Sequence, residues 1–138
     1  MALTLAVAAT SCGRRAPPTA SATIGALTVS GAFAYEPITP ASGAAYFRVH
    51  NGGTEADTLV SASSPTTHGA MFHTANMGRR ETLPIPAGGE LVLQPGGTHL
   101  MLSDFSPAPA AGDSLQLDLV FAHAGRLTLW LPVRAYTQ

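Results

Sequence analysis

Soft metal-binding side chains gather in one window of this sequence. Apart from Met1, every methionine lies between Met71 and Met101, and the same window holds His73 and His99. A thioether is a soft, neutral ligand that selects Cu(I) among biological metals, and imidazole binds the same ion. Calcium and magnesium require oxygen donors, and zinc does not favour a thioether. The candidate donors, which are Met71, His73, Met77, His99 and Met101, therefore predict a Cu(I) site.

The spacing of these residues would let two strands bring them together. Residues i and i+2 of a β-strand project from the same face, so His99 and Met101 should point together, as should Met71 and His73. If the two strands lie side by side, imidazole nitrogens and thioether sulfurs surround one small volume. The sequence contains two such pairs, and this is a stronger signal than any single residue.

Each donor also has a structural interpretation. Methionine commonly fills hydrophobic cores, and a lone histidine is usually a surface or hydrogen-bonded residue. A second hypothesis is therefore a lipid-anchored structural or interaction sandwich with no metal role. A copper enzyme is a third, weaker hypothesis, because it needs a proton-transfer group and no carboxylate lies at a suitable sequence distance from the His-Met pairs. We predict that His50 and His123 are surface residues, and we leave open whether His68 joins the site.

Composition excludes several other classes of protein. The chain has 138 residues, of which 46% are hydrophobic and 11% charged, and its formal net charge is −1 with no lysine. Nucleic-acid binding is not expected, because no basic run is available for phosphate contacts. Cys12 is the only cysteine, so an intramolecular disulfide and sites built from several thiolates are excluded. Other catalytic arrangements are weakly represented, and we expect that the protein is not an enzyme.

Glycine and proline divide the chain into many short segments. The sequence has 14 glycines and 11 prolines, spread throughout, and no segment shows sustained helical periodicity. Strands are predicted over residues 24–33, 44–50, 57–62, 70–74, 90–93, 98–102, 115–121 and 127–133. Residues 83–89 are expected to be irregular, and Gly96 and Gly97 are expected to form a hairpin turn. Seven or eight short strands predict an all-β antiparallel sandwich or barrel.

The first 22 residues are predicted to direct export. Residues 1–12 are mostly apolar and too short to span a membrane, and residues 13–22 are rich in Ala, Pro, Ser and Thr. The run from Ala9 to Cys12 resembles the lipobox of bacterial lipoproteins, so Cys12 could carry a lipid; an ordinary cleaved or frayed N-terminus is the alternative. Residues 23–138 form the predicted domain. We expect it in the periplasm or cell envelope.

The sequence around the donors resembles the periplasmic copper chaperones of the PCuAC type. Their pattern is His, ten residues, Met, twenty-one residues, His-x-Met; here Met77 is followed by twenty-one residues and then by His99-Leu100-Met101. Four segments look like the family, namely residues 45–52, 63–65, 85–90 and 94–102. The resemblance covers Ile24 to Arg134. One departure is clear, because only three residues separate His73 from Met77.

The resemblance implies a fold, a ligand set and a role. The fold would be a cupredoxin-like, or more broadly immunoglobulin-like, antiparallel β-sandwich. The ligands carried over are His73, Met77, His99 and Met101. The role would be delivery of Cu(I) to the copper centre of cytochrome c oxidase, with subunit II of that enzyme as partner. Because the first spacer is short, Met71 could replace Met77, or three ligands could suffice.

Overall fold

The computed structural model describes residues 19–136, and within that range the regular structure consists of strands alone. The strands are β1 (Ala20–Ile24), β2 (Leu27–Tyr35), β3 (Ser42–Asn51), β4 (Asp57–Ser63), β5 (Thr67–His73), β6 (Arg79–Arg80), β7 (Leu83–Ile85), β8 (Glu90–Leu93), β9 (His99–Phe105), β10 (Ser114–Phe121) and β11 (Gly125–Arg134). The predicted all-β class is confirmed, with eleven strands instead of seven or eight. Residues 1–18 of the predicted export segment, including Cys12, lie outside the described residues. The predicted linker ends earlier than expected, because β1 begins at Ala20.

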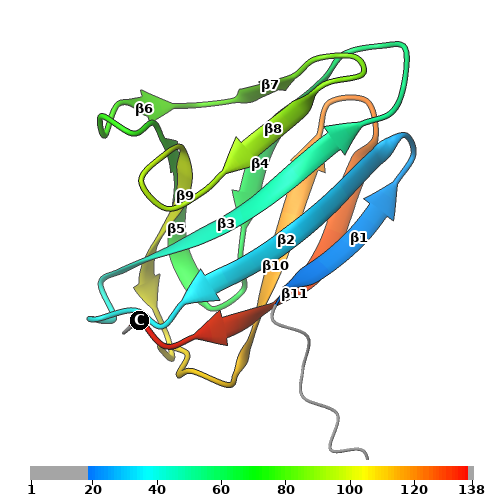
Figure 1. Cartoon of the computed structure of the whole chain (residues 1–138). Coiled ribbons are helices and arrows are strands. Elements are labelled where there is room, and N and C mark those ends of the chain that lie inside the picture. Colours follow the sequence, from blue (N-terminus) through cyan, green and yellow to red (C-terminus); the bar gives the residue numbers. More distant parts are fainter. Residues whose placement is uncertain (1–18, 137–138) are drawn as a thin grey trace, which may run out of the picture.

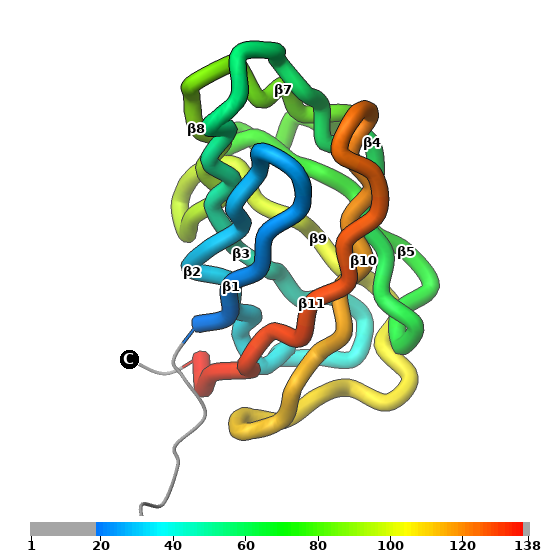
Figure 2. The backbone as a smooth tube through the Cα atoms, turned by 90° about the vertical axis from the view of Figure 1, so that its right-hand side faces the viewer, coloured from blue at the N-terminus to red at the C-terminus, as the bar shows by residue number. Residues whose placement is uncertain are grey.

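The strands form two layers that are joined along one side (Figure 1). Their order is β6-β5-β9-β3-β2-β11-β10-β4-β7, with β1 paired to β2 and β8 to β3. One layer runs from β6 to β2, and β11, β10, β4 and β7 make the other; Figure 2 shows them from the side. The junction is a short parallel pairing of β11 with β2, and all other strand pairs are antiparallel.

The structure differs from the predicted strands in three places. Residues 24–33 form a hairpin and not one strand, because Gly25 adopts φ 55° and Ile24 pairs with Leu27 across a two-residue turn. Glycine at the first turn position suits a tight hairpin. Residues 83–85, expected to be irregular, form β7; Pro84 is tolerated there because β7 is the last strand of its layer. The two-residue strand β6 was not predicted.

The core lies between the two layers. On most strands buried aliphatic and aromatic side chains alternate with exposed or half-buried residues, as a sheet with one solvated face requires. The largest fully buried side chains are Phe47, Phe121, Leu27, Leu59, Ile85, Leu100, Leu102, Leu117, Leu119, Leu131, Val29 and Val49. Because β5 and β9 each bury one face here, their alternate residues must face outward. This alternation positions the candidate donors.

A buried carboxylate ties the turn between β10 and β11 to β4. Asp57 accepts hydrogen bonds from the backbone N–H groups of Thr58, His123 and Ala124, at 2.7, 2.9 and 2.9 Å. Burial by itself raises the pKa of Asp57, but these three N–H donors and the nearby His123 outweigh it and leave the pKa lowered. The ionised form is therefore favoured in the folded protein.

We expect Asp57→Asn to lower the free energy of unfolding at neutral pH by about 1–3 kcal/mol, because an amide cannot accept all three hydrogen bonds. A lowered carboxyl pKa contributes stability that is fully present above the unfolded value of about 3.9 and is lost as the pH falls through the folded value. The difference in free energy of unfolding between the wild type and Asp57→Asn should therefore shrink below about pH 4. Urea unfolding across pH measures it. Glu55→Gln, at an exposed carboxylate, is the control and should change little.

Candidate metal centre

Strands β5 and β9 place two pairs of donors directly opposite each other. His73 pairs with His99 and Met71 pairs with Met101 in the antiparallel register. Between these pairs, Phe72 faces Leu100, and both side chains are buried in the core. The four donors therefore share the outer face of the sheet. The sequence predicted each i, i+2 pair, and the register now brings the two pairs side by side.

The two imidazoles meet across the strand pair. The ring centroids of His73 and His99 are 5.5 Å apart, and the ring planes make an angle of 69°. Both side chains are half-buried. At this distance the two rings are close enough for one ion to contact a nitrogen of each ring. Two histidines on one side of a sheet are therefore available to a single ion.

The loop between β8 and β9 positions His99. Strands β8 and β9 both pair with β3, β8 along residues 47–50 and β9 along residues 42–45. Residues 94–98 loop out between them, closed by a hydrogen bond from the Gln94 N–H to the Thr98 carbonyl at 3.0 Å. The prediction of a hairpin at Gly96 and Gly97 was therefore wrong, because the strands on either side do not pair with each other. Gly96 has φ 81°, which suits glycine at this turn.

One main-chain contact sets the tautomer of His99. The Nδ1 atom of His99 lies 3.1 Å from the carbonyl oxygen of Gly97, and a carbonyl can only accept a hydrogen bond. Nδ1 therefore carries the proton in neutral His99, and the lone pair of Nε2 is free. Metal-binding histidines usually donate their second N–H in this way, which orients the ring. The His99 ring is thus prepared to donate through Nε2.

His73 has a ring nitrogen without a hydrogen-bond partner in the described part of the chain. Its Nδ1 atom is buried and has no hydrogen-bond partner among residues 19–136. Burying a polar nitrogen without a partner costs free energy, so such atoms are rare in folded proteins. A metal ion at this place would satisfy the nitrogen. The unpartnered atom and the soft donor set both fit copper.

Met77 lies in the tight loop between β5 and β6. Its N–H donates to the Thr74 carbonyl at 2.9 Å, and the Gly78 N–H donates to the Thr74 hydroxyl at 3.2 Å. Met77 adopts φ 62°, in the left-handed region that disfavours side chains with a Cβ. Its side chain is 59% exposed. Strained backbone of this kind concentrates at functional sites.

We expect Met77→Gly to be more stable than Met77→Ala by about 1 kcal/mol, because alanine keeps the cost of left-handed backbone that glycine avoids. In regular secondary structure the order is reversed, with glycine less stable than alanine by about 0.5–1 kcal/mol. Urea unfolding of the two variants in the absence of metal provides the comparison. If the alanine variant is the more stable one, Met77 is not held in a strained conformation.

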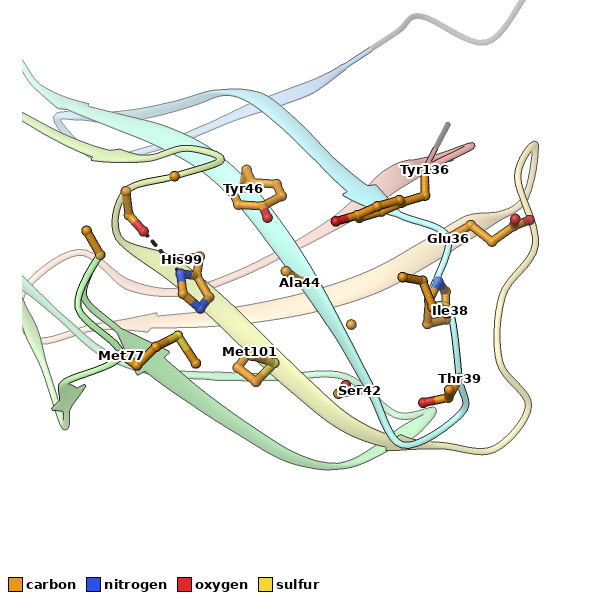
Figure 3. Close-up of a pocket in the computed structure, with 15 residues that line it drawn as sticks. Glu36, Ile38, Thr39, Ser42, Ala44, Tyr46, Met77, His99, Met101 and Tyr136 are labelled. Atoms are coloured by element: carbon orange, nitrogen blue, oxygen red, sulfur yellow. Dashed lines mark hydrogen bonds between the residues drawn. The ribbon is translucent and has the colours of Figure 1, made fainter. Parts of the chain in front are cut away.

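An open cavity of about 510 Å³ connects three of the predicted ligands. Met77, His99 and Met101 lie together at one end of it (Figure 3), and Gly96 and Gly97 also line the cavity. The short spacer before Met77 therefore does not take this side chain away from the other two. The fourth predicted ligand, His73, does not line the cavity but faces His99 from β5.

The remaining histidines lie elsewhere. His68 is exposed, and its Nδ1 is 3.1 Å from the Asp104 carbonyl oxygen. Strand parity places His68 on the face opposite to His73, which separates it from the donor set. His50 and His123 are exposed, as predicted. Within residues 19–136 no group of three His, Cys, Asp or Glu side chains is placed to hold a metal ion.

The fold and the donor face define a class of protein, namely a small β-sandwich domain with imidazole and thioether groups gathered beside one open cavity. The chain belongs to the LpqE-like family, because the family model described as "Putative lipoprotein LpqE-like" matches residues 15–133. A comparison with curated protein sequences gives no match. No helix in residues 19–136 is long and apolar enough to cross a membrane.

Solved structures share the fold. The copper-bound PCuAC domain from PmoF2 is 25% identical, with a TM-score of 0.78, covering 84% of this chain and 98% of that domain. The apo PCuAC domain from PmoF1 is 24% identical, with a TM-score of 0.79 and coverage of 84% and 99%. The solution structure of CuI-DR1885 from Deinococcus radiodurans is 24% identical, with a TM-score of 0.68 and coverage of 86% and 83%. The predicted cupredoxin-like sandwich is thereby confirmed.

Proposed function

We propose that this protein is an extracytoplasmic copper carrier that binds Cu(I) through His73, Met77, His99 and Met101. The observation that carries the proposal is the pairing of His73 with His99 across β5 and β9, at a centroid distance of 5.5 Å. The Gly97 carbonyl leaves Nε2 of His99 free, and two thioethers lie at the same end of the cavity. Thioether and imidazole together favour Cu(I) over harder ions.

The comparisons support copper as the cargo. The PmoF2 domain that shares this fold is copper-bound, and DR1885 is described in its CuI form. The description of the matching family, "Putative lipoprotein LpqE-like", supports a place outside the cytoplasm, in the periplasm or cell envelope. Attachment to the membrane through a lipid on Cys12 is part of the proposal.

The proposed role is transport and not catalysis. A carrier must hold copper against solvent and yet release it to an acceptor. The exposed thioether of Met77 is the donor that an incoming protein reaches first, whereas His73, His99 and Met101 are half-buried. Release would proceed by stepwise exchange, in which an acceptor side chain replaces Met77 before the histidines let go. We propose the copper site of cytochrome c oxidase subunit II as the acceptor.

Thermal unfolding with and without Cu(I) tests the proposal. A ligand that binds only the folded state stabilises it by RT ln(1 + [L]/Kd), which is about 2.7 kcal/mol at a free concentration of 100 Kd. We expect the unfolding midpoint to rise with Cu(I), kept reduced by ascorbate, and not with Zn²⁺. If the midpoint is unchanged and no Cu(I) is retained after desalting, the copper-carrier proposal is wrong and the domain is purely structural.

Delivery needs a separate experiment. Copper-loaded protein is mixed with the metal-free soluble domain of oxidase subunit II, the two proteins are separated, and the copper content of each is measured. We expect copper to move to the acceptor. If copper stays with the carrier while other acceptors withdraw it, the carrier role stands but this recipient is wrong.

A further inference from the structure

One soft donor on the outer face of β5 is not part of the proposed ligand set. Met71 lies directly opposite Met101 and two residues before His73, on the same face as both. We propose that Met71 is a reserve thioether ligand, which replaces Met77 on copper when Met77 is engaged or released during transfer. This inference rests on the proposed copper-carrier function.

The register brings Met71 within reach of the site. Residues directly opposite each other on antiparallel strands have Cβ atoms about 4.5–5.5 Å apart. A methionine side chain is unbranched and has three rotatable bonds, so its sulfur can move several ångströms without any change in the backbone. Met71 and Met101 are both half-buried, which leaves their side chains room to move. Their sulfurs can therefore approach the same ion.

The neighbours of this pair contain no competing donor. The next pair on the same face is Gly69 with Ser103, which offers a hydroxyl but no sulfur or imidazole. On its other side Met101 pairs with Ala44 of β3, whose side chain is a methyl group. Met71 is thus the one soft donor beside Met101 on the described part of this face, apart from the proposed ligands.

Met71 and Met77 differ in the property that transfer requires. Met77 is 59% exposed in a strained loop, whereas Met71 is half-buried in a regular strand. An acceptor therefore reaches the side chain of Met77 more readily than that of Met71. A thioether held on the strand can keep copper bound to the carrier while the loop thioether exchanges. The thioether of Met77 therefore does not need to stay on copper throughout transfer.

The test compares Met77→Leu, Met71→Leu and the double variant. Leucine is close to methionine in volume and lacks sulfur, so core and surface packing change little. Cu(I) affinity is measured by competition with a chromogenic chelator. If Met71 takes over, the double variant should lose at least about tenfold more affinity than the two single variants combined, which is a coupling of about 1.4 kcal/mol. Strictly additive losses would overturn the inference.

X-ray absorption of the copper-loaded Met77→Leu protein gives a second, independent readout. This variant changes only an exposed loop residue and should fold normally. We expect copper to keep the same number of sulfur ligands as in the wild type, because Met71 replaces the lost thioether. One fewer sulfur would overturn the inference. Wild-type protein that binds no Cu(I) at all would instead contradict the proposed function, so the two failures are distinguishable.

Discussion

Replacing His99 with alanine is expected to lower the Cu(I) affinity by at least about a hundredfold. Loss of a residue that merely orients a ligand typically costs 10–100-fold in metal affinity, so removal of the ligand itself should cost no less. His99 is central to the site, because it faces His73 and lines the cavity beside Met77 and Met101. Competition with a chromogenic Cu(I) chelator measures the change.

His50→Ala is the matched control for this prediction. His50 is exposed on β3 and pairs with Glu90 of β8, away from the donor face of β5 and β9. Its removal should leave the Cu(I) affinity unchanged. Equal affinities for both variants and the wild type would refute the assignment of His99. The free energy of unfolding without copper should be similar in both variants, which separates loss of a ligand from loss of the fold.

Leu100→Ala is expected to lower the free energy of unfolding by about 2–5 kcal/mol. Leu100 lies between His99 and Met101 in β9 but points to the opposite side, where its side chain is 0% exposed. Truncation there removes buried apolar surface and leaves a cavity that the closely packed core can fill only in part. Urea unfolding in the absence of copper measures the loss.

Met101→Leu, at the next residue of β9, should lose Cu(I) affinity but little stability. Exchange of methionine for leucine usually costs less than about 1.5 kcal/mol of stability, and Met101 is half-buried on the outer face. Its Cu(I) affinity should nevertheless fall, because a proposed sulfur ligand is gone. A large loss of stability in Met101→Leu would show that this side chain belongs to the core and would favour the structural interpretation of the methionines.

Local pattern was enough to predict much of the fold. The alternation of leucines in 115–121 and 127–133 predicted β10 and β11, and residues 44–50 fall within β3. The hairpin at Gly25 was missed because the residues on either side alternate as a single strand would. The alternation continues through the turn, and only the positive φ of glycine shows where the chain reverses.

The candidate site was predictable only in part. The same-face pairing of His99 with Met101 follows from strand geometry and needs no tertiary information. The opposition of His73 and His99 depends on the register between β5 and β9, which the topology of the whole sheet determines. The left-handed conformation of Met77 and the free Nδ1 of His73 could not be predicted from residue types, because both arise from the positions of neighbouring backbone.

The contact between His99 and the Gly97 carbonyl affects which substitutions the site can tolerate during evolution. In many metal sites the group that orients a histidine is an Asp or Glu side chain, which a single point mutation can delete. Here that group is a peptide oxygen, which every amino acid possesses. A substitution at position 97 can change the orientation of the His99 ring only by changing the main-chain conformation there. Inheritance of the ligand orientation is therefore tied to the loop's shape and not to the identity of any one residue.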